Sequence, residues 1–156
     1  MKSKNILFDV LKKATQKQIE QDIVKIKNLR LKKQNALNQS KQLTNYRNEY
    51  EKKLFFKIKS GMCVHQWKNY NTFILILKNI IKKNEYMIQN DQILIEEALT
   101  SWLKSKKKLR IWQYFINKHK IYISKLQYMQ EQKDFDEYIQ LTILKQGHDI
   151  NVKNYM

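Results

Sequence analysis

Residues 67–126 read WKNYNTFILILKNIIKKNEYMIQNDQILIEEALTSWLKSKKKLRIWQYFINKHKIYISKL. Every seventh position from Trp67 to Ile123 in this stretch is apolar. The nine residues are Trp67, Ile74, Ile81, Ile88, Ile95, Trp102, Leu109, Ile116 and Ile123. With 42% hydrophobic residues in the chain, chance alone gives such a row with odds of roughly 0.42 to the ninth power. A strict seven-residue repeat of this length predicts a long coiled-coil helix with a left-handed supercoil.

A second row of the same helix, three residues further along, has a mixed character. Its members are Tyr70, Leu77, Asn84, Asp91, Ala98, Ser105, Trp112, His119 and Leu126. A single regular apolar row needs a partner to bury it, and the first third of the chain is the candidate. Residues 3–58 contain neither glycine nor proline, and their apolar positions follow spacings of three, four and seven. These positions are Ile19, Ile26, Leu29, Ala36, Leu43, Tyr50 and Leu54, with Lys33, Ser40 and Arg47 interrupting the row.

The scarcity of turn formers determines the fold class. The chain has two glycines and no proline, whereas compact β and α/β folds depend on both for their reversals. Gly61 can adopt the left-handed conformation that ends a helix, and a short link favours an antiparallel pair. We therefore expect an all-α antiparallel two-helix coiled-coil hairpin with the second helix longer, forming a single domain over residues 1–156.

The expected boundaries follow from the two glycines. The first helix covers about 3–58, the turn about 59–63 and the second helix about 64–146, where Gly147 ends it and leaves a polar tail at 147–156. At 1.5 Å per residue, the first arm ends opposite a position near residue 119, about where the heptad row stops. The segment 131–146, which is rich in Asp and Glu, then overhangs as a docking tip or as frayed helix.

The net charge of +17 raises the question of nucleic acid, since clustered cations neutralise phosphates. Only three of the 31 cationic residues are arginine, although phosphate and base readers favour its planar fork. Lysine, isoleucine and asparagine share A/T-rich codons, which explains much of the lysine. The basic run at 104–108 is interpreted as a solvated helix face. Residues 1–59 carry 16 basic and 5 acidic residues, so the first arm is the more basic.

Signatures of catalysis, metal binding and membrane insertion are weak. Two glycines exclude a glycine-rich phosphate loop, and Cys63 with His65 supplies only two of the four ligands of a structural zinc site. A single cysteine fits a reducing compartment. The longest apolar run, residues 73–77, is far below the ~18 residues of a membrane span, and Asp9 interrupts the apolar run near the N-terminus. We expect a cytoplasmic protein without catalytic, cofactor-binding or metal-binding residues.

A further set of apolar residues is hard to bury in one seam. Gln39, Leu43, Tyr46 and Tyr50 share one face of the first helix, and Phe73, Leu77 and Ile80 form a short stripe on the second. Exposed aromatic stripes on helices usually mark a protein partner. The alternative is that some of these side chains widen the seam.

The order of these residues resembles the FliJ proteins of flagellar type III export. The resemblance covers roughly residues 5–146. No single motif in it is chemically distinctive, but the order of the motifs and the distances between them match the family. They are Tyr46-Arg47-Asn48-Glu49-Tyr50, Trp67-Lys68-Asn69-Tyr70 with Phe73, Ser101-Trp102, Trp112-Gln113 and Glu131-Gln132-Lys133-Asp134-Phe135-Asp136-Glu137.

The resemblance implies a fold and a set of partners. FliJ proteins form a two-helix coiled coil similar to the stalk subunit of rotary ATPases. They bind the hexameric flagellar export ATPase and promote its assembly, contact the cytoplasmic linker of the export-gate membrane protein, and bind substrate chaperones. This implies a cytoplasmic location, peripheral at the inner membrane at the flagellar base. The positions that match the gate-binding face are Gln39, Leu43, Tyr46, Tyr50, Phe73 and Leu77, whereas Ile80 and Asn84 depart from the family pattern there.

We therefore expect a non-enzymatic stalk that regulates the export ATPase, with no nucleic acid among its partners. Two alternatives remain open from the sequence. A lysine-rich nucleic-acid-binding coiled coil predicts a duplex affinity that falls steeply with salt. A self-associating structural coiled coil predicts stable dimers or larger species in sedimentation, whereas a hairpin that buries its own seam is stable as a monomer.

Overall fold

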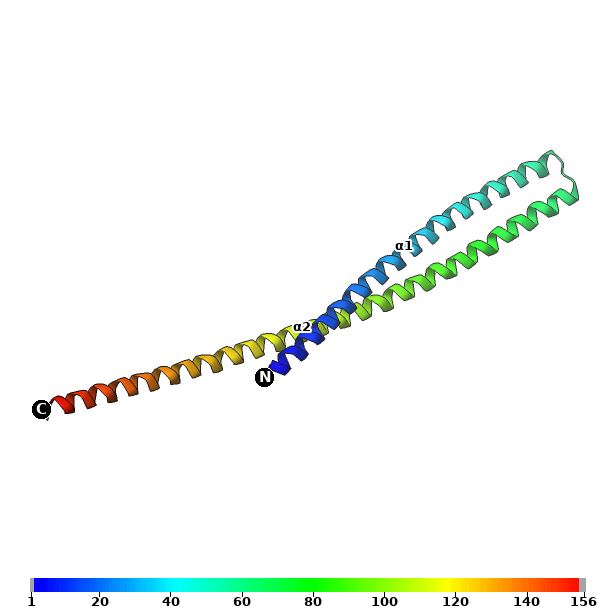
Figure 1. Cartoon of the computed structure of the whole chain (residues 1–156). Helices are drawn as coiled ribbons and strands as arrows, with labels where there is room; N and C mark the ends of the chain where they lie inside the picture. Colours follow the sequence, from blue (N-terminus) through cyan, green and yellow to red (C-terminus); the bar gives the residue numbers. More distant parts are fainter. Residues whose placement is uncertain (1, 155–156) are drawn as a thin grey trace. The chain divides into compact units, whose positions relative to one another are not determined.

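Two helices joined by a short turn make up the described chain. The structure is a computed structural model that describes residues 2–154, in which α1 covers Lys2–Ser60 and α2 covers Val64–Asn154 (Figure 1). No strand occurs among these residues. The all-α class and the longer second helix are confirmed.

The turn between the helices covers residues 61–63 and is built on Gly61. This glycine has a φ of +93°, and its N–H donates to the carbonyl of Ile58 at 3.3 Å. Such a left-handed residue, which costs glycine nothing sterically, ends α1. At the start of α2 the N–H of Trp67 donates to the carbonyl of Cys63 at 3.1 Å. Ser60, which we expected in the turn, is the last residue of α1.

The end of α2 differs from the expectation. We predicted that Gly147 ends the helix and begins a polar tail at 147–156, but α2 continues through Gly147 to Asn154. Gly147 has no positive φ, and a Cβ built on it meets nothing within 4 Å. A glycine ends a helix only where the chain takes the left-handed turn, and here the backbone stays helical. Residues 155–156 of the expected tail lie outside the described residues.

The chain divides into two compact units, which we call the turn unit (Thr15–Lys107) and the terminal unit (Met1–Ala14 with Lys108–Met156). In the turn unit α1 and α2 lie antiparallel (Figure 1). The Asn84 side-chain amide donates to the carbonyl of Ala36 at 2.8 Å, and the rings of Tyr50 and Phe73 have centroids 4.6 Å apart. These pairs join positions that approach one another in sequence toward the turn, as antiparallel packing requires.

The seam of the turn unit is formed on α1 by two rows at seven-residue spacing. All twelve members are buried or half-buried. Several of them are polar, so the apolar row expected from the sequence forms only part of the packed face. The rows are Thr15, Asp22, Leu29, Ala36, Leu43 and Tyr50, and Ile19, Ile26, Lys33, Ser40, Arg47 and Leu54.

On α2 both heptad rows face α1, including the polar members of the mixed row. Asn84, Asp91 and Ser105 are 7%, 1% and 7% exposed. The carboxylate of Asp91 lies 3.2 Å from Nζ of Lys32, while its Oδ2 is buried without a hydrogen-bond partner. Position in the heptad, rather than side-chain polarity, therefore determines burial in this seam.

The terminal unit has a shorter packed region. Phe8 of α1 stacks on Phe115 with ring centroids 6.1 Å apart and lies 6.3 Å from the ring of Trp112. Ile116 is buried and Ile123 half-buried. From residue 124 to residue 151, every side chain except the half-buried Thr142 is exposed. Within residues 2–154, neither helix has a stretch long and apolar enough to cross a membrane.

Candidate partner-binding site

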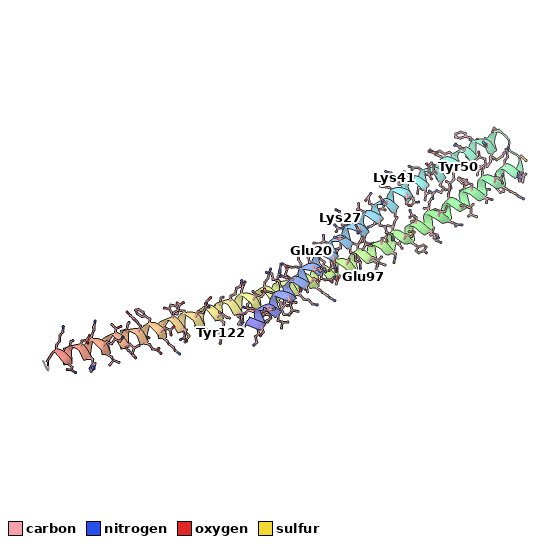
Figure 2. All side chains as sticks on the ribbon, in the orientation of Figure 1. Glu20, Lys27, Lys41, Tyr50, Glu97 and Tyr122 are labelled. Carbon is pink, nitrogen blue, oxygen red and sulfur yellow. The ribbon has the colours of Figure 1, made fainter. Side chains whose placement is uncertain are left out.

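The candidate site begins as one face of α1 in the turn unit. Gln39 and Tyr46 are exposed, Tyr46 by 53%, whereas Leu43 and Tyr50 are half-buried. Spacings of four, three and four residues keep these side chains on the same side of the helix. Leu43 and Tyr50 also belong to a seam row, so this face borders directly on the packed interface. Figure 2 shows Tyr50 on α1 near the turn.

Tyr50 connects this face to α2. Its ring lies 4.6 Å from that of Phe73 at an interplanar angle of 56°, and 6.1 Å from that of Tyr70 at 49°. Tilted aromatic pairs at such distances are favourable beyond the area they bury. Phe73 remains 40% exposed. We call Tyr46, Tyr50, Tyr70 and Phe73 the aromatic patch, to which both helices contribute. Of the residues predicted for the site, Tyr50 and Phe73 are in contact across the helices.

Two lysines border the aromatic patch. Nζ of Lys53 lies 5.3 Å from the centre of the Tyr50 ring. Nζ of Lys57 lies 4.7 Å from the centre of the Tyr70 ring and donates to the Tyr70 hydroxyl at 2.7 Å. Tyr70 is half-buried, and the sequence pattern predicts it as a seam residue rather than as part of the candidate face. Cations over ring faces hold exposed aromatics in place and give the border of the patch a positive charge.

Leu77 differs from its predicted role as a surface residue. It is 5% exposed and belongs to the seam, which leaves almost none of its side chain accessible to a partner. Among the departures from the family pattern, Asn84 is also buried in the seam, whereas Ile80 is 43% exposed. The position of Leu77 fits both the surface stripe and the heptad row. An apolar side chain at such a position is buried where the two helices pack together. The sequence pattern alone left this choice open for Leu77.

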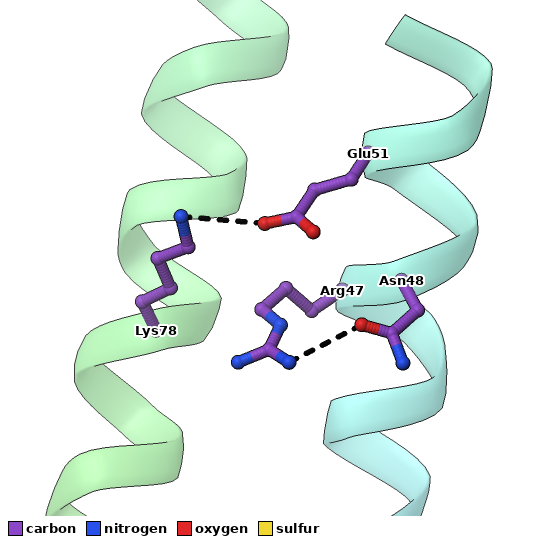
Figure 3. A network of polar contacts seen from close by, with 4 residues as sticks. All are labelled: Arg47, Asn48, Glu51 and Lys78. Carbon is purple, nitrogen blue, oxygen red and sulfur yellow. Dashed lines mark hydrogen bonds and ion pairs between the residues drawn. The ribbon is translucent and has the colours of Figure 1, made fainter. Parts of the chain in front are cut away.

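A polar network lies beside the patch between α1 and α2 (Figure 3). Lys78 of α2 pairs with Glu51 of α1 at 3.3 Å, and the Arg47 guanidinium donates to the Asn48 side-chain oxygen at 3.2 Å. Nε of Arg47 is buried without a hydrogen-bond partner. The side chains of Lys78 and Glu51 are 52% and 42% exposed, so solvent screens their pair and it contributes little to stability. Its orientation across the helices favours the observed register.

The end of the turn unit next to Gly61 exposes apolar side chains that we did not single out from the sequence. Phe55 and Phe56 are 56% and 66% exposed. Trp67, predicted as the first seam residue, is 44% exposed and lies in the first turn of α2. Two consecutive phenylalanines before a turn were the sequence signal for this surface, since a seam takes only one of two neighbours. The further exposed members are Ile58 and Val64.

Within the described chain, no group of three or more His, Cys, Asp or Glu residues is placed to hold a metal ion. Cys63 and His65 are both exposed near the turn. His119 is half-buried in the terminal unit, with Nδ1 buried and without a hydrogen-bond partner. What the arrangement offers chemically is an exposed aromatic surface with a basic border, suited to binding another protein.

Two antiparallel helices, a three-residue turn and heptad rows on both facing sides define the class of protein, an α-helical coiled-coil hairpin. The comparisons identify the family. The model of the family described as "Flagellar FliJ protein" matches residues 4–148. The chain belongs to the FliJ family and is thus a component of the flagellar protein export apparatus.

Relatives agree with this assignment. A flagellar FliJ protein of Buchnera aphidicola from Schizaphis graminum is 41% identical over 97% of this chain and 100% of its own length. One from the Acyrthosiphon pisum strain of the same species is 36% identical over 91% of this chain and 98% of its own. The Escherichia coli protein of that name is 27% identical over 86% and 92%. No solved structure matches the chain.

Proposed function

We propose that this protein acts as a non-enzymatic stalk that binds the hexameric flagellar export ATPase and promotes its assembly and turnover. It also contacts the export gate through the aromatic patch and escorts substrate chaperones. Its place is then cytoplasmic, at the flagellar base, and peripheral to the inner membrane through its partners. The observation that carries the proposal is the seam of the turn unit. Twelve consecutive heptad positions of α1 are buried or half-buried against α2.

A stalk has to resist bending when a ring turns or closes around it. Two helices packed along heptad rows are stiffer than either alone, because bending one requires sliding its side chains past those of the other. Contacts across the helices, such as Asn84 with Ala36 and Asp91 with Lys32, fix the register along the seam. The absence of glycine and proline from residues 3–58 removes the usual causes of a sharp kink from the first arm.

Electrostatics supports a ring partner whose inner surface is acidic. Residues 1–59 hold 16 basic and 5 acidic residues, and complementary charge speeds and orients association. Salt screens such an attraction over about 8–10 Å. Binding to the ATPase is therefore expected to weaken as ionic strength rises, and binding that is insensitive to salt contradicts this part of the proposal.

The aromatic patch is assigned to the export gate. Tyr46 is 53% exposed and Phe73 40% exposed, with Tyr50 packed between α1 and α2. Tyrosines at such a surface bury a large apolar area and keep a hydroxyl for hydrogen bonding, which suits a protein partner. The patch and the ring-binding surface are then separable by mutation.

The test measures ATP hydrolysis and ring formation by the cognate flagellar export ATPase with and without this chain. The wild-type chain is expected to raise turnover and the fraction of hexamer. The Tyr46→Ala, Tyr50→Ala variant is expected to stimulate the ATPase normally but to bind the isolated gate linker at least about tenfold more weakly, a loss of at least about 1.4 kcal/mol. Tyr86→Ala is the matched control, because Tyr86 is 63% exposed on α2 outside the patch.

Each outcome has one meaning. If the wild-type chain leaves ATP hydrolysis unchanged at every concentration, the proposed role in promoting the ATPase is wrong. If the double variant no longer stimulates the ATPase, the aromatic patch binds the ATPase ring and not the export gate. Because Tyr50 packs on Phe73, the single Tyr46→Ala variant is run alongside, with circular dichroism to show that both variants remain helical.

A further inference from the structure

The α2 helix of the terminal unit has a second apolar stripe, which the seam does not use. Tyr114, Ile121, Tyr128 and Phe135 follow one another at intervals of seven and are 61%, 69%, 68% and 62% exposed. A parallel row beside them is exposed by 42–51%. We call these eight residues the outer face. The remaining members are Ile111, Phe115, Tyr122 and Met129, with Tyr122 labelled in Figure 2.

The outer face points away from the seam of its own unit. Tyr114 is two residues from both Trp112 and Ile116, which are half-buried and buried. Two residues correspond to about 200° around an α-helix, so these side chains leave opposite sides of α2. The α1 segment that packs on Trp112 therefore leaves the row of Tyr114 uncovered. It reaches only the edge of the outer face, where the ring of Phe8 stacks on that of Phe115, which stays 42% exposed. A stripe that repeats every seven residues fits the surface of another helix better than an irregular surface.

The exposed area of the outer face is that of a stable interface. Its five aromatic and three aliphatic side chains are 42–69% exposed. With about 150–250 Å² for a whole aromatic side chain, roughly 100 Å² remains exposed on each. The outer face then offers about 800 Å² per copy, the area that each partner contributes to an interface of standard size.

The charge along α2 indicates which helix covers the outer face. Residues 108–130 contain five basic residues and no acidic one, whereas residues 131–137 contain four acidic residues and one lysine. A helix that is basic at one end of its apolar stripe and acidic at the other is complementary to itself only when the two copies are antiparallel. A parallel pair places like charges side by side, which is unfavourable. The basic residues are Lys108, Arg110, Lys118, Lys120 and Lys125.

We propose that the outer face binds the outer face of a second copy of this chain, with the two α2 helices antiparallel. The acidic segment 131–137 of each copy then lies beside the basic segment of the other. The interface is isologous, so every contact occurs twice about the two-fold axis. This pairing does not depend on the export role, because it uses surfaces of the purified chain alone, and none of its residues belongs to the aromatic patch.

Sedimentation equilibrium of the full chain tests the pairing. The wild type is expected to interconvert between monomer and dimer as its concentration rises. Ile121→Ser with Tyr128→Ser is expected to weaken the dimer at least about tenfold, which corresponds to about 1.4 kcal/mol for two central anchors. Tyr86→Ser is the control, being equally exposed on α2 but outside the outer face. Both variants change exposed side chains, so their helical content is expected to match the wild type.

Charge reversal and distance measurements test the antiparallel arrangement. Lys118→Glu with Lys120→Glu, and separately Asp134→Lys with Asp136→Lys, are each expected to weaken self-association, while a mixture of the two restores dimer formation. A spin label at Gln113 in a Cys63→Ser background reports the orientation. Antiparallel copies centred near residue 124 hold the two labels roughly 30 Å apart, and parallel copies roughly 10 Å.

Three results overturn the proposal. The first is a chain that stays monomeric throughout the concentration series. The second is a dimer that Ile121→Ser with Tyr128→Ser leaves unchanged, which places self-association elsewhere. The third is a short label distance, which shows parallel helices. Stimulation of the export ATPase is measured on the same variants, so that a failure of self-association and a failure of the proposed export role are recorded separately.

Discussion

Two parts of α2 form the same secondary structure by different means. Residues 64–107, in the turn unit, place a row of side chains such as Ile81, Ile95 and Ala98 against α1, and these are 3–6% exposed. Residues 124–151, in the terminal unit, bury none and leave only Thr142 half-buried. Tertiary packing stabilises the first part, and helix propensity with uninterrupted backbone hydrogen bonds has to hold the second. The comparison indicates that stability resides in the seam, whereas the outer part of α2 is available for binding.

The seam also combines stability with specificity. Asp22, Asn84, Asp91 and Ser105 are all at most 7% exposed, where apolar residues would pack better. Asp22 accepts hydrogen bonds from Ser101 at 3.2 Å and from Gln18 at 3.1 Å. Buried polar groups of this kind specify register at some cost in stability. A long apolar seam alone would permit slippage by one heptad, which these partners oppose.

The largest expected change in stability comes from truncating one apolar side chain in each of the two parts of α2. Ile95→Ala truncates a residue that is 5% exposed, and Leu141→Ala truncates one that is 59% exposed. A cavity in the seam is expected to lower the free energy of unfolding by about 2–4 kcal/mol. The exposed leucine is expected to change it by less than about 0.5 kcal/mol. Urea denaturation followed by circular dichroism measures both.

Equal losses for the two variants contradict this view of α2, since Leu141 then needs a packing partner. If instead Ile95→Ala hardly changes the free energy of unfolding, neighbouring side chains fill the cavity, and the heptad rows are packed less tightly than in the structure. Leu144→Ala, at 69% exposure, repeats the control at a second position.

A smaller effect is expected from the buried charge in the seam. In Lys32→Ala the carboxylate of Asp91, 1% exposed, loses its partner at 3.2 Å. A buried charge without compensation is expected to lower the free energy of unfolding by about 1–3 kcal/mol. Adding Asp91→Leu is expected to recover that loss, because the unpaired charge is then gone. Lys133→Ala in the exposed segment is the control and is expected to have no measurable effect.

The double variant separates two roles of this ion pair. If Lys32→Ala with Asp91→Leu unfolds at the same urea concentration as Lys32→Ala alone, the loss arises from the missing lysine stem and not from the unpaired carboxylate. If it is more stable than the wild type, the pair is retained for register. Cysteine cross-linking of α1 to α2 is then expected to show more than one alignment in the double variant.

Much of this architecture follows from the sequence. The nine-position apolar row predicted a long α2, and Gly61 placed the turn where its positive φ is observed. The polar members of the second row, among them Asp91, are buried although polar side chains prefer contact with water. Helix geometry explains this, because residues three apart from a buried row share its face whatever their polarity.

The candidate site was predictable only in part. The spacing of Leu43, Tyr46 and Tyr50 predicts that they share one face of α1. The contact of Tyr50 with Phe73 extends the site onto α2. Leu77 satisfied the surface stripe and the seam row equally well, so no single-helix pattern decides between them. The seven-residue spacing alone does not predict the outer face, because such a row equally indicates a seam, and α2 carries two such rows on opposite sides.

The smallest effect is expected at the position where the predicted boundary was wrong. Gly147 lies inside α2 with nothing within 4 Å of a Cβ built on it. Gly147→Ala is therefore expected to favour the local helix by up to about 1 kcal/mol. Amide hydrogen exchange of residues 143–151 is expected to slow several-fold. The urea midpoint of the whole chain is expected to stay the same, since exposed residues 124–151 contribute nothing to the seam.

This substitution distinguishes local from global stability in one helix. A shift of the global midpoint means that the segment around Gly147 unfolds together with the seam, so that the contrast between the two parts of α2 is one of exposure only. Unchanged exchange means that residues beyond 147 are not helical in solution, and the boundary expected from the glycine returns. Slower exchange at a constant midpoint shows that this segment folds by itself, as a helix that keeps its side chains free for a partner.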